Sequence, residues 1–430
     1  MRLGGRLQAA IEVLSDIQTR HRPVPEALKD WGLSHRFAGS GDRAAISNLV
    51  HDALRMRLSH GFIMDGDSPA DLAVATLLRQ WNISPESLVE ALTGDRFAPE
   101  IPASDKLSAC LARDLSQAPA HVQADVPEWL AASFARGFGA EWEAEAQALT
   151  ARPPLDLRVN TLMATRDQVL DAFSDRGAQP TRLSPFGVRF EAGKGAERQL
   201  AATSEVSFAR GWFEIQDEGS QLAALLAGAA PGEAVLDYCA GGGGKSLAFA
   251  AMMANQGQIS AFDADRRRLA PMVERIRRAG AEIIDIRERL TDLAGLEGTM
   301  DRVLIDAPCT GTGTWRRRPD AKWRISEKNI ADRMADQDKV LNAAAVYVRP
   351  GGELAYVTCS LLPQENGDRV EAFLARNTDF ELLDPAPRWT ACVAAPGEPV
   401  PLAHNGPGLT LSPRRTGTDG FYFAVMRRKA

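Results

Sequence analysis

The sequence predicts a Rossmann-like, doubly wound α/β domain over residues 206–430, preceded by an all-helical segment and a small α/β module. Short apolar runs that read as strands alternate with helical patterns along this C-terminal part, a spacing typical of mostly parallel sheets. Four consecutive glycines stand between the first of these strands and the next helix, as in nucleotide-binding turns. Residues 1–95, in contrast, repeat their apolar residues only at helical spacing.

Composition limits the class of protein. At 430 residues the chain is long enough for two or three domains. No apolar stretch approaches the length of a membrane span, and the N-terminus lacks the apolar core of a signal peptide, so no membrane partner is expected. The five cysteines are widely spread and form no C-x-x-C pair, so neither a disulfide framework nor a metal site is predicted. Free thiols fit a reducing, cytoplasmic location.

The first 95 residues are predicted to form a helical packing or binding domain, because they carry no cluster of reactive side chains. Residues 96–120 contain prolines and small polar residues and are expected to be a linker with a short helix. The helical faces are marked by Leu7, Ile11, Leu14 and Ile17, and by Ile46, Val50, Ala53, Leu54 and Leu58, with Ser40-Gly41-Asp42 as the expected N-cap of the second helix and further helices at 71–78 and 84–92.

Residues 121–205 are expected to form the small α/β module. A helical pattern leads into predicted strands at 155–160, 181–183 and 188–190, with a helix at 165–173. The strands predicted for the C-terminal domain are 234–236, 258–263, 281–286, 301–306, 354–357 and 420–425, with a helix over 266–278.

The glycine run Gly241–Gly244 is the centre of the C-terminal domain. Glycines let the backbone approach a ligand closely, and N–H groups entering a helix favour an electron-rich partner. A Walker A loop would need glycine where Cys239 stands, and a dinucleotide fingerprint would need one in place of Ser246. The remaining interpretation is the adenosyl-methionine loop of a methyltransferase, for which Asp263, at the end of the second strand, supplies the acid that holds the ribose hydroxyls.

Two cysteines follow neighbouring strands of the predicted sheet. Cys309 lies in a Pro-Cys-Thr-Gly-Thr-Gly turn after the fourth strand, and Cys359 lies in a Thr-Cys-Ser turn after the fifth. Ligands of such sheets bind beyond the carboxyl ends of the strands, so both thiols are expected at the rim that holds the cofactor loop. A buried structural cysteine is the usual role of a single thiol, but two at adjacent strand ends favour chemistry.

The pair suits methyl transfer to carbon 5 of a pyrimidine. That carbon is a poor nucleophile, and a thiolate that adds at carbon 6 makes it nucleophilic. After the transfer, a second group must help to remove the carbon-5 proton so that the enzyme is released. Asp306 is placed to hydrogen-bond the edge of the base, and a nearby basic cluster would lower the pKa of the attacking thiol.

One cluster of basic residues favours a nucleic-acid partner. The net charge of −6 argues mildly against such a partner, but a footprint needs only a local basic patch. Arg316-Arg317-Arg318, with Lys322 and Arg324, follows Cys309 closely, and we expect it to contact backbone phosphates.

Several motifs resemble those of the Nop2/Sun RNA cytosine-5 methyltransferases, and the Asp-Ala-Pro-Cys and Thr-Cys-Ser motifs together are the most specific. The motifs are Gln216-Asp217-Glu218-Gly219-Ser220, the loop 239–245, Asp306-Ala307-Pro308-Cys309-Thr310-Gly311-Thr312-Gly313, Arg317-Arg318-Pro319-Asp320-Ala321-Lys322-Trp323, Thr358-Cys359-Ser360-Leu361-Leu362-Pro363-Gln364-Glu365-Asn366 and Thr418-Asp419-Gly420-Phe421.

The resemblance implies roles for single residues. Cys359 would be the nucleophile and Cys309 the thiol that aids product release, with Asp306 as the third catalytic residue. The implied cofactor is S-adenosyl-L-methionine, and no metal is implied. The residues expected to contact the cofactor are Cys239, Ala240, Gly241, Gly242, Gly243, Gly244, Lys245, Asp263 and Asp306.

The resemblance also covers the N-terminal half. Residues 1–95 resemble the NusB-like RNA-binding domain of the bacterial Sun/RsmB branch around Gly41–Ile46, and the middle module resembles that branch's small RNA-binding domain around Leu157–Asn160. In that branch the substrate is a cytosine of small-subunit (16S) ribosomal RNA, so rRNA processing is implied.

Two departures from the family pattern stand out. The family loop usually reads Ala-Pro-Gly-Gly-Lys, whereas Gly241 and Gly242 replace the Ala-Pro here, so we expect a more flexible loop. The family also places an acid after the third strand on the adenine side, where this chain offers only Glu288.

Three alternatives stay open. In a DNA cytosine methyltransferase Cys309 would attack, although the Thr-Cys-Ser turn at Cys359 argues against this. Transfer RNA is another possible substrate of the same chemistry. A non-catalytic RNA-binding ribosome-assembly factor with a degenerate cofactor pocket is supported only by the altered glycine loop.

Overall fold

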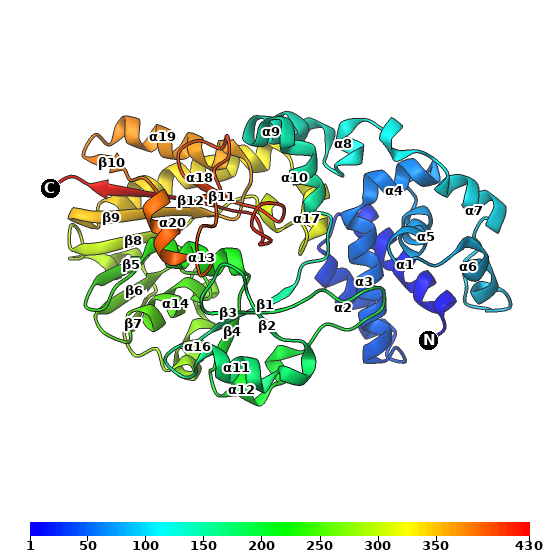
Figure 1. Ribbon diagram of the computed structural model, residues 1–430, viewed down its shortest axis with the longest axis horizontal. Helices are drawn as coiled ribbons and strands as arrows, with labels where there is room; N and C mark the ends of the chain where they lie inside the picture. The colour runs from blue at the N-terminus through cyan, green and yellow to red at the C-terminus, as the bar shows by residue number, and fades with distance from the viewer.

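The computed structural model describes all 430 residues and shows a helical lobe beside a larger α/β lobe (Figure 1). The N-terminal helices pack around one apolar core that includes Leu14, Leu49, Leu77 and Leu107. Their apolar residues share one face of each helix because they recur every three or four positions. The helices are α1 (Leu3–Arg20), α2 (Val24–Ser34), α3 (Ser40–Arg55), α4 (Arg57–Met64), α5 (Pro69–Arg79), α6 (Pro85–Leu92) and α7 (Ser104–Leu111).

A small antiparallel sheet with strand order β2-β3-β1-β4 follows. Its apolar face packs against α11, where Val169 and Phe173 meet Leu157 and Phe213. The elements of this part are α8 (Ala120–Gln123), α9 (Glu128–Phe138), α10 (Trp142–Ala148), β1 (Leu155–Val159), α11 (Arg166–Ala172), β2 (Gln179–Pro180), β3 (Gly187–Phe190), α12 (Val206–Ala209) and β4 (Phe213–Ile215).

The large sheet has the strand order β10-β12-β9-β8-β5-β6-β7, with β11 paired to β12. Strands β9, β8, β5, β6 and β7 run parallel, and β10, β11 and β12 are antiparallel additions at one edge. The strands are β5 (Ala234–Asp237), β6 (Gln258–Phe262), β7 (Ile284–Arg287), β8 (Met300–Asp306), β9 (Val348–Thr358), β10 (Phe380–Leu382), β11 (Leu409–Leu411) and β12 (Phe421–Arg428). The helices are α13 (Glu218–Ala227), α14 (Gly244–Met252), α15 (Arg266–Leu269), α16 (Met272–Ala279), α17 (Pro319–Arg324), α18 (Glu327–Ala345), α19 (Gly367–Arg376) and α20 (Ala386–Cys392).

Helices cover both faces of this sheet, as the doubly wound prediction requires (Figure 1). On one face α13, α14 and α20 bury Leu222, Phe249 and Trp389. On the other face α18 and α19 bury Leu341 and Phe373. Because successive strand residues point to opposite faces, the central strands are apolar on both sides.

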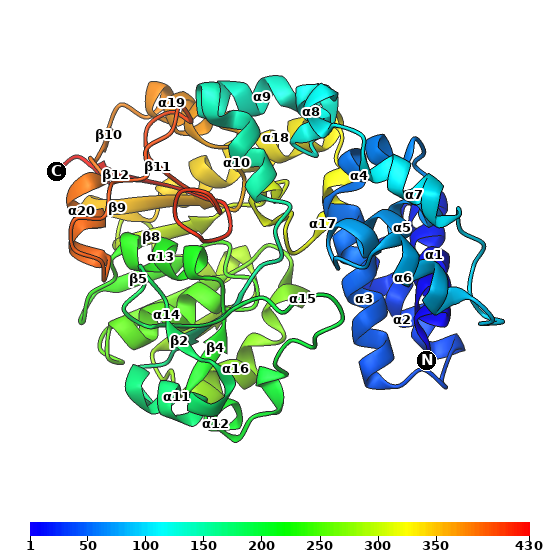
Figure 2. The same ribbon diagram turned by 45° about the vertical axis from the view of Figure 1, so that its right-hand side comes forward.

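The two lobes meet where α17 docks against the end of α3 (Figure 2). Lys322 Nζ donates to the carbonyl of Arg55 at 2.9 Å, and Trp323 Nε1 donates to the carbonyl of Leu54 at 2.7 Å. In return, Arg55 Nε donates to the carbonyl of Arg316 at 2.7 Å. The last carbonyls of a helix lack partners within it, so α17 satisfies groups that α3 leaves open.

Several local predictions were wrong. The helix expected over 266–278 is two helices, because Pro271 interrupts it. Helix α3 begins at Ser40 with Gly39 as its N-cap and no side-chain cap, and Leu58 belongs to the following helix. The strand expected at 181–183 lies at 179–180. Among all helices, none is long and apolar enough to cross a membrane.

Candidate active site

The structure brings Cys309 and Cys359 together. Strands β8 and β9 are parallel neighbours, and each cysteine lies just beyond the carboxyl end of its strand. The two Sγ atoms are 3.3 Å apart although the residues are far apart in sequence, and both thiols are partly exposed. Strand topology therefore places two sulfurs at one point on the rim of the sheet.

The environment distinguishes the two thiols. The hydrogen bond with Cys359 and burial raise the pKa of Cys309 well above its ordinary value, and the nearby carboxylate of Glu365 adds to the effect. Cys309 therefore keeps its proton at neutral pH and can donate it in a hydrogen bond to the sulfur of Cys359.

A buried carboxylate joins the two cysteine turns. Glu365 accepts hydrogen bonds from Thr310 N at 2.8 Å, Ser360 Oγ at 2.5 Å and Gln337 Nε2 at 3.1 Å, and also from Thr310 Oγ1. Thr310 adjoins Cys309, and Ser360 adjoins Cys359. Fully buried Glu365 thereby fixes one turn relative to the other.

The glycine loop leads from β5 into α14. Gly243 has φ of +81°, and a Cβ there would lie 2.7 Å from Met272 Cγ, so only glycine fits. Asp263, at the end of β6, accepts a hydrogen bond from Gly241 N at 3.0 Å. Lys245 Nζ donates to Asp306 Oδ2 at 2.6 Å. The residues predicted from sequence for the cofactor thus lie around one loop.

Acidic side chains around the loop suit a cationic ligand. Burial, with smaller effects from the carboxylates of Asp306 and Asp263, raises the pKa of Asp237 to about 7. Asp237 Oδ2 accepts from Ser246, but Oδ1 is buried without a partner. Burial likewise raises the pKa of the Cys239 thiol, which marks it as a packing residue of the loop and not a thiolate. Lys245 and Arg268 pair with Asp306 and Asp263 at 2.6 Å and 3.0 Å, so Asp237 is the acid of this group without a cation partner. A ligand with an ammonium or a sulfonium group would supply one.

Arg316 and Arg317 of the basic cluster are not available to contact phosphates as predicted. Arg316 is 4% exposed and pairs with Asp419 and Asp217, and Arg317 pairs with the same two carboxylates. Their charges are therefore neutralised inside the protein and are not free for phosphates. Only Arg318 of the triplet is exposed and unpaired.

The acid expected on the adenine side is exposed. Glu288 follows the end of β7 and makes no hydrogen bond or ion pair, while Asp285 of the strand pairs with Arg287 at 2.6 Å. No contact in the structure gives either residue a place in the cofactor site.

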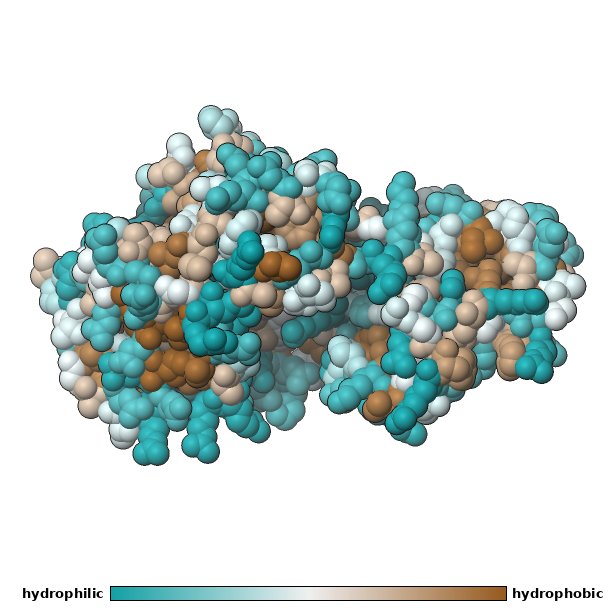
Figure 3. All heavy atoms as spheres, turned by 90° about the horizontal axis from the view of Figure 1, so that it is seen from below, coloured by the Kyte–Doolittle hydropathy of each residue, from teal (hydrophilic) through white to brown (hydrophobic).

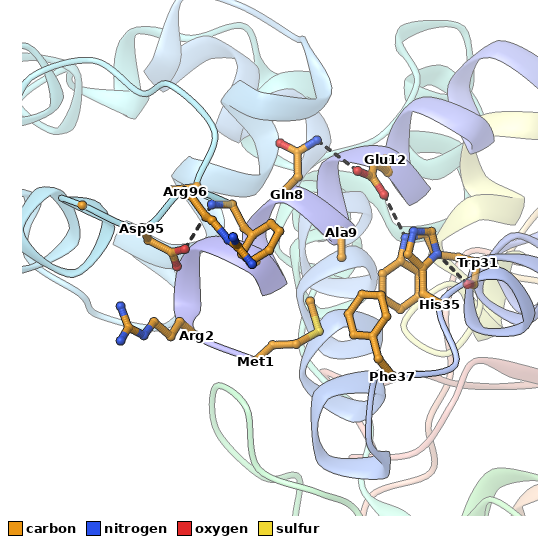
Figure 4. Close-up of a pocket in the computed structure, with 14 residues that line it drawn as sticks. Met1, Arg2, Gln8, Ala9, Glu12, Trp31, His35, Phe37, Asp95 and Arg96 are labelled. Atoms are coloured by element: carbon orange, nitrogen blue, oxygen red, sulfur yellow. Dashed lines mark hydrogen bonds between the residues drawn. The ribbon is translucent and has the colours of Figure 1, made fainter.

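A large cavity of about 1040 Å³ lies in the helical lobe, away from the cysteines. In Figure 4, Trp31, His35 and Phe37 gather on one side of it, and Asp95 and Arg96 lie on the other. Trp31 and His35 are stacked with ring centroids 4.3 Å apart. None of the lining residues belongs to the two cysteine turns or the glycine loop.

Sequence reasoning missed the roles of two acids. Glu365 stood within a quoted motif, but its contacts to both cysteine turns become visible only in the fold. Asp237 precedes the glycine loop directly, and an acid at the end of an apolar strand was the signal that could have marked it.

Comparison with known proteins decides the family. Residues 224–427 match the model described as 16S rRNA methyltransferase RsmB/F, and residues 126–195 match the RsmF/B-like ferredoxin-like domain. Ribosomal RNA small subunit methyltransferase B of Erwinia tasmaniensis is 33% identical over 302 residues, which are 70% of this chain and 66% of that protein. The probable methyltransferase B of Synechocystis sp. is 34% identical over 312 residues, which are 71% of this chain and 67% of that protein. The chain belongs to the RsmB/F methyltransferase family.

The RsmB/F resemblance read from the motifs is thereby confirmed, and so is the Rossmann-like α/β fold. A crystal structure of PH0851 covers 100% of both chains with a TM-score of 0.73 at 24% identity, which shows a shared fold. The RsmB/F alignments above span 66% and 67% of the length of the curated relatives. The NusB-like character of the helical lobe stays a prediction.

Proposed function

We propose that this RsmB/F chain is an S-adenosyl-L-methionine-dependent methyltransferase that forms 5-methylcytosine in 16S ribosomal RNA. The observation that carries the proposal is the 3.3 Å separation of the two Sγ atoms beside the glycine loop. A pair of partly exposed thiols at a ligand-binding rim suits the formation and release of a covalent pyrimidine adduct. The names of the curated relatives support ribosomal RNA as the substrate.

The residues around the loop fit the cofactor, which supplies an electrophilic methyl group when bound. The segment from Cys239 through Ala240 and Gly241–Gly244 to Lys245 would form the wall of its site. Asp263 is placed to hold the ribose hydroxyls, as acids at this strand end do in related folds. The unpartnered oxygen of Asp237 and the exposed part of Asp306 offer carboxylates to its positive charges.

The two thiols divide the work on the base. The pair releases one proton to solvent, and the remaining proton stays on Cys309, whose pKa is raised. Cys359 then adds to carbon 6 of the cytosine as a thiolate, which makes carbon 5 nucleophilic. After methylation, a base takes the carbon-5 proton, the carbon–sulfur bond breaks, and its electron pair returns to Cys359. The S–H of Cys309 stabilises this leaving thiolate, and Asp306 orients the edge of the base.

The target cytosine must leave its stack to reach the thiols. Seen from below, the surface is hollowed between the two lobes, and hydrophilic side chains cover much of its walls (Figure 3). We assign RNA binding to the helical domain 1–95 and to the small module 121–205, with 96–120 as the linker and 206–430 as the methyltransferase domain. The core of the helical domain extends through α7, where Leu107 is fully buried, so the first part of the proposed linker packs with this domain. The separate match of residues 126–195 supports the small module.

Trapping tests the assignment of the nucleophile. RNA that carries 5-fluorocytosine blocks removal of the group at carbon 5, so the wild-type protein should hold it covalently in the presence of cofactor. We expect Cys359→Ala to form no adduct, and Cys309→Ala to accumulate adduct with ordinary cytosine. The reverse pattern would show that Cys309 attacks, as in the DNA-type alternative.

Two further measurements test the rest of the proposal. Calorimetry should show binding of S-adenosyl-L-methionine, and its absence would favour the non-catalytic assembly factor. Bisulfite sequencing of rRNA from cells with and without the protein should show one cytosine that loses its protection when the protein is absent. A signal in transfer RNA only would move the substrate to that class.

A further inference from the structure

Two arginines hold the carbonyl groups of the glycine loop. Arg275 of α16 donates through Nη1 to the carbonyl of Gly242, and Arg158 of β1 donates through Nη1 to the carbonyl of Gly244. Both are charge-assisted hydrogen bonds, which are stronger than neutral ones. A Cβ at position 242 would lie 3.1 Å from Arg275 Nη1, so the guanidinium fills the space beside the glycine.

The small sheet anchors both arginines. Glu214 of β4 is 4% exposed and receives Arg275 Nη2 at 3.0 Å and Nε at 3.2 Å. Arg158, itself 5% exposed, stands opposite Glu214 in the β1–β4 register and also donates to Gln216 Oε1 at 2.5 Å. The contacts that restrain the loop thus come from the cross-strand pair Arg158–Glu214 of the small sheet, whereas the loop itself follows β5 of the large sheet.

This restraint matters because the loop consists of glycines. Glycine loses more conformational freedom on ordering than any other residue, so an unrestrained run of four would have to be ordered by the ligand itself. Groups held in the bound conformation beforehand raise affinity by lowering that cost.

We propose that Arg158 and the Glu214–Arg275 pair form a brace that holds the glycine loop in its ligand-binding conformation, so that the small sheet sets the affinity for the cofactor. The inference rests on the proposed S-adenosyl-L-methionine site and deepens it. Arg158 and Arg275 touch the loop backbone, and Glu214 holds Arg275. All three act as positioning residues, without a part in the chemistry.

Arg275→Met tests the brace, and Arg278→Met is its matched control. Arg278 lies on the same helix and pairs with the same Glu214, but it makes no bond to the loop. Loss of one charge-assisted bond predicts about tenfold weaker binding of S-adenosyl-L-methionine and of S-adenosyl-L-homocysteine by calorimetry for Arg275→Met. Arg278→Met should change either dissociation constant less than twofold. The KM for the cofactor should rise with Arg275→Met while kcat at saturating cofactor stays near the wild-type value.

Hydrogen exchange provides a measurement that needs neither cofactor nor RNA. Amides of residues 238–246 should exchange faster in Arg275→Met than in the wild type and in Arg278→Met.

The outcomes separate the two proposals. A wild-type protein that binds no cofactor overturns the proposed function, and the exchange data still decide whether the loop is braced. Normal cofactor binding by the wild type, with equal affinity and equal loop exchange in Arg275→Met and Arg278→Met, overturns the brace alone.

Discussion

Replacement of Glu365 by alanine should destabilise the protein and separate the two thiols. The carboxylate accepts from Thr310 N, Gln337 Nε2 and two hydroxyl groups in a fully buried position. The hydroxyl of Ser360 has another partner in Thr312 at 3.1 Å, and Gln337 also donates to a carbonyl at 2.9 Å. The lost carboxylate therefore leaves about two donors poorly satisfied, which at ~1–3 kcal/mol each predicts a loss of about 2–6 kcal/mol in the free energy of unfolding.

Urea denaturation measures the change in stability, and diamide oxidation measures the alignment of the thiols. In the wild type the 3.3 Å spacing should let diamide join Cys309 and Cys359 in a disulfide that peptide mapping detects. Glu365→Ala should slow this reaction several-fold. Glu371→Ala is the control, because Glu371 lies on α19, is exposed and makes no hydrogen bond or ion pair. A stability loss below about 1 kcal/mol, or equal disulfide rates in the two variants, would refute the claim that Glu365 sets the spacing.

Three further predictions concern buried charges. Asp419→Asn should cost about 3 kcal/mol in urea denaturation, the low end for a broken buried ion pair, because buried Arg316 keeps only its longer pair with Asp217 at 3.3 Å; an unchanged midpoint would contradict this. Burial lowers the pKa of Lys322 to about 8, so between pH 8 and 10.5 the amine is protonated only in the unfolded chain. The free energy of unfolding should therefore rise across this window by up to about 3 kcal/mol. Lys322→Met should flatten the rise. Burial lowers the pKa of His60 to about 3, so stability present above pH 6.5 should fall by up to about 5 kcal/mol as the pH drops toward 3, and a His60→Leu variant with the same acid profile would disprove the assignment.

The site was predictable from sequence where topology alone fixes it. Parallel neighbouring strands bring their carboxyl ends to one rim, so two cysteines after predicted strands had to lie near each other. The same logic placed Asp263 beside the glycine loop. Helix α14 and the central strands were equally visible because their apolar pattern is continuous.

Long-range pairing was not predictable in this way. Arg316 and Arg317 read as a surface cluster because their partners, Asp217 and Asp419, lie about a hundred residues away on either side. Short edge strands such as β10 and β11 carry too few residues for a periodic signal, and their place depends on pairing with β12. Ion pairs and strand pairs between residues far apart in the chain form only on folding, so they leave no local pattern in the sequence.

The positive charges of the segment from Cys309 to Trp323 mostly make contacts within the protein, which leaves few of them for RNA. Arg316 and Arg317 neutralise the buried carboxylates of Asp217 and Asp419, and Arg324, just beyond the segment, pairs with Asp320 at 2.6 Å. Lys322 and Trp323 hold the last turn of α3. The segment that begins at Cys309 therefore ends at the contact between the two lobes, so one short stretch of backbone sets the positions of both Cys309 and the helical lobe. A lobe that binds RNA and is fixed in this way would present its RNA at a constant distance from the two sulfurs.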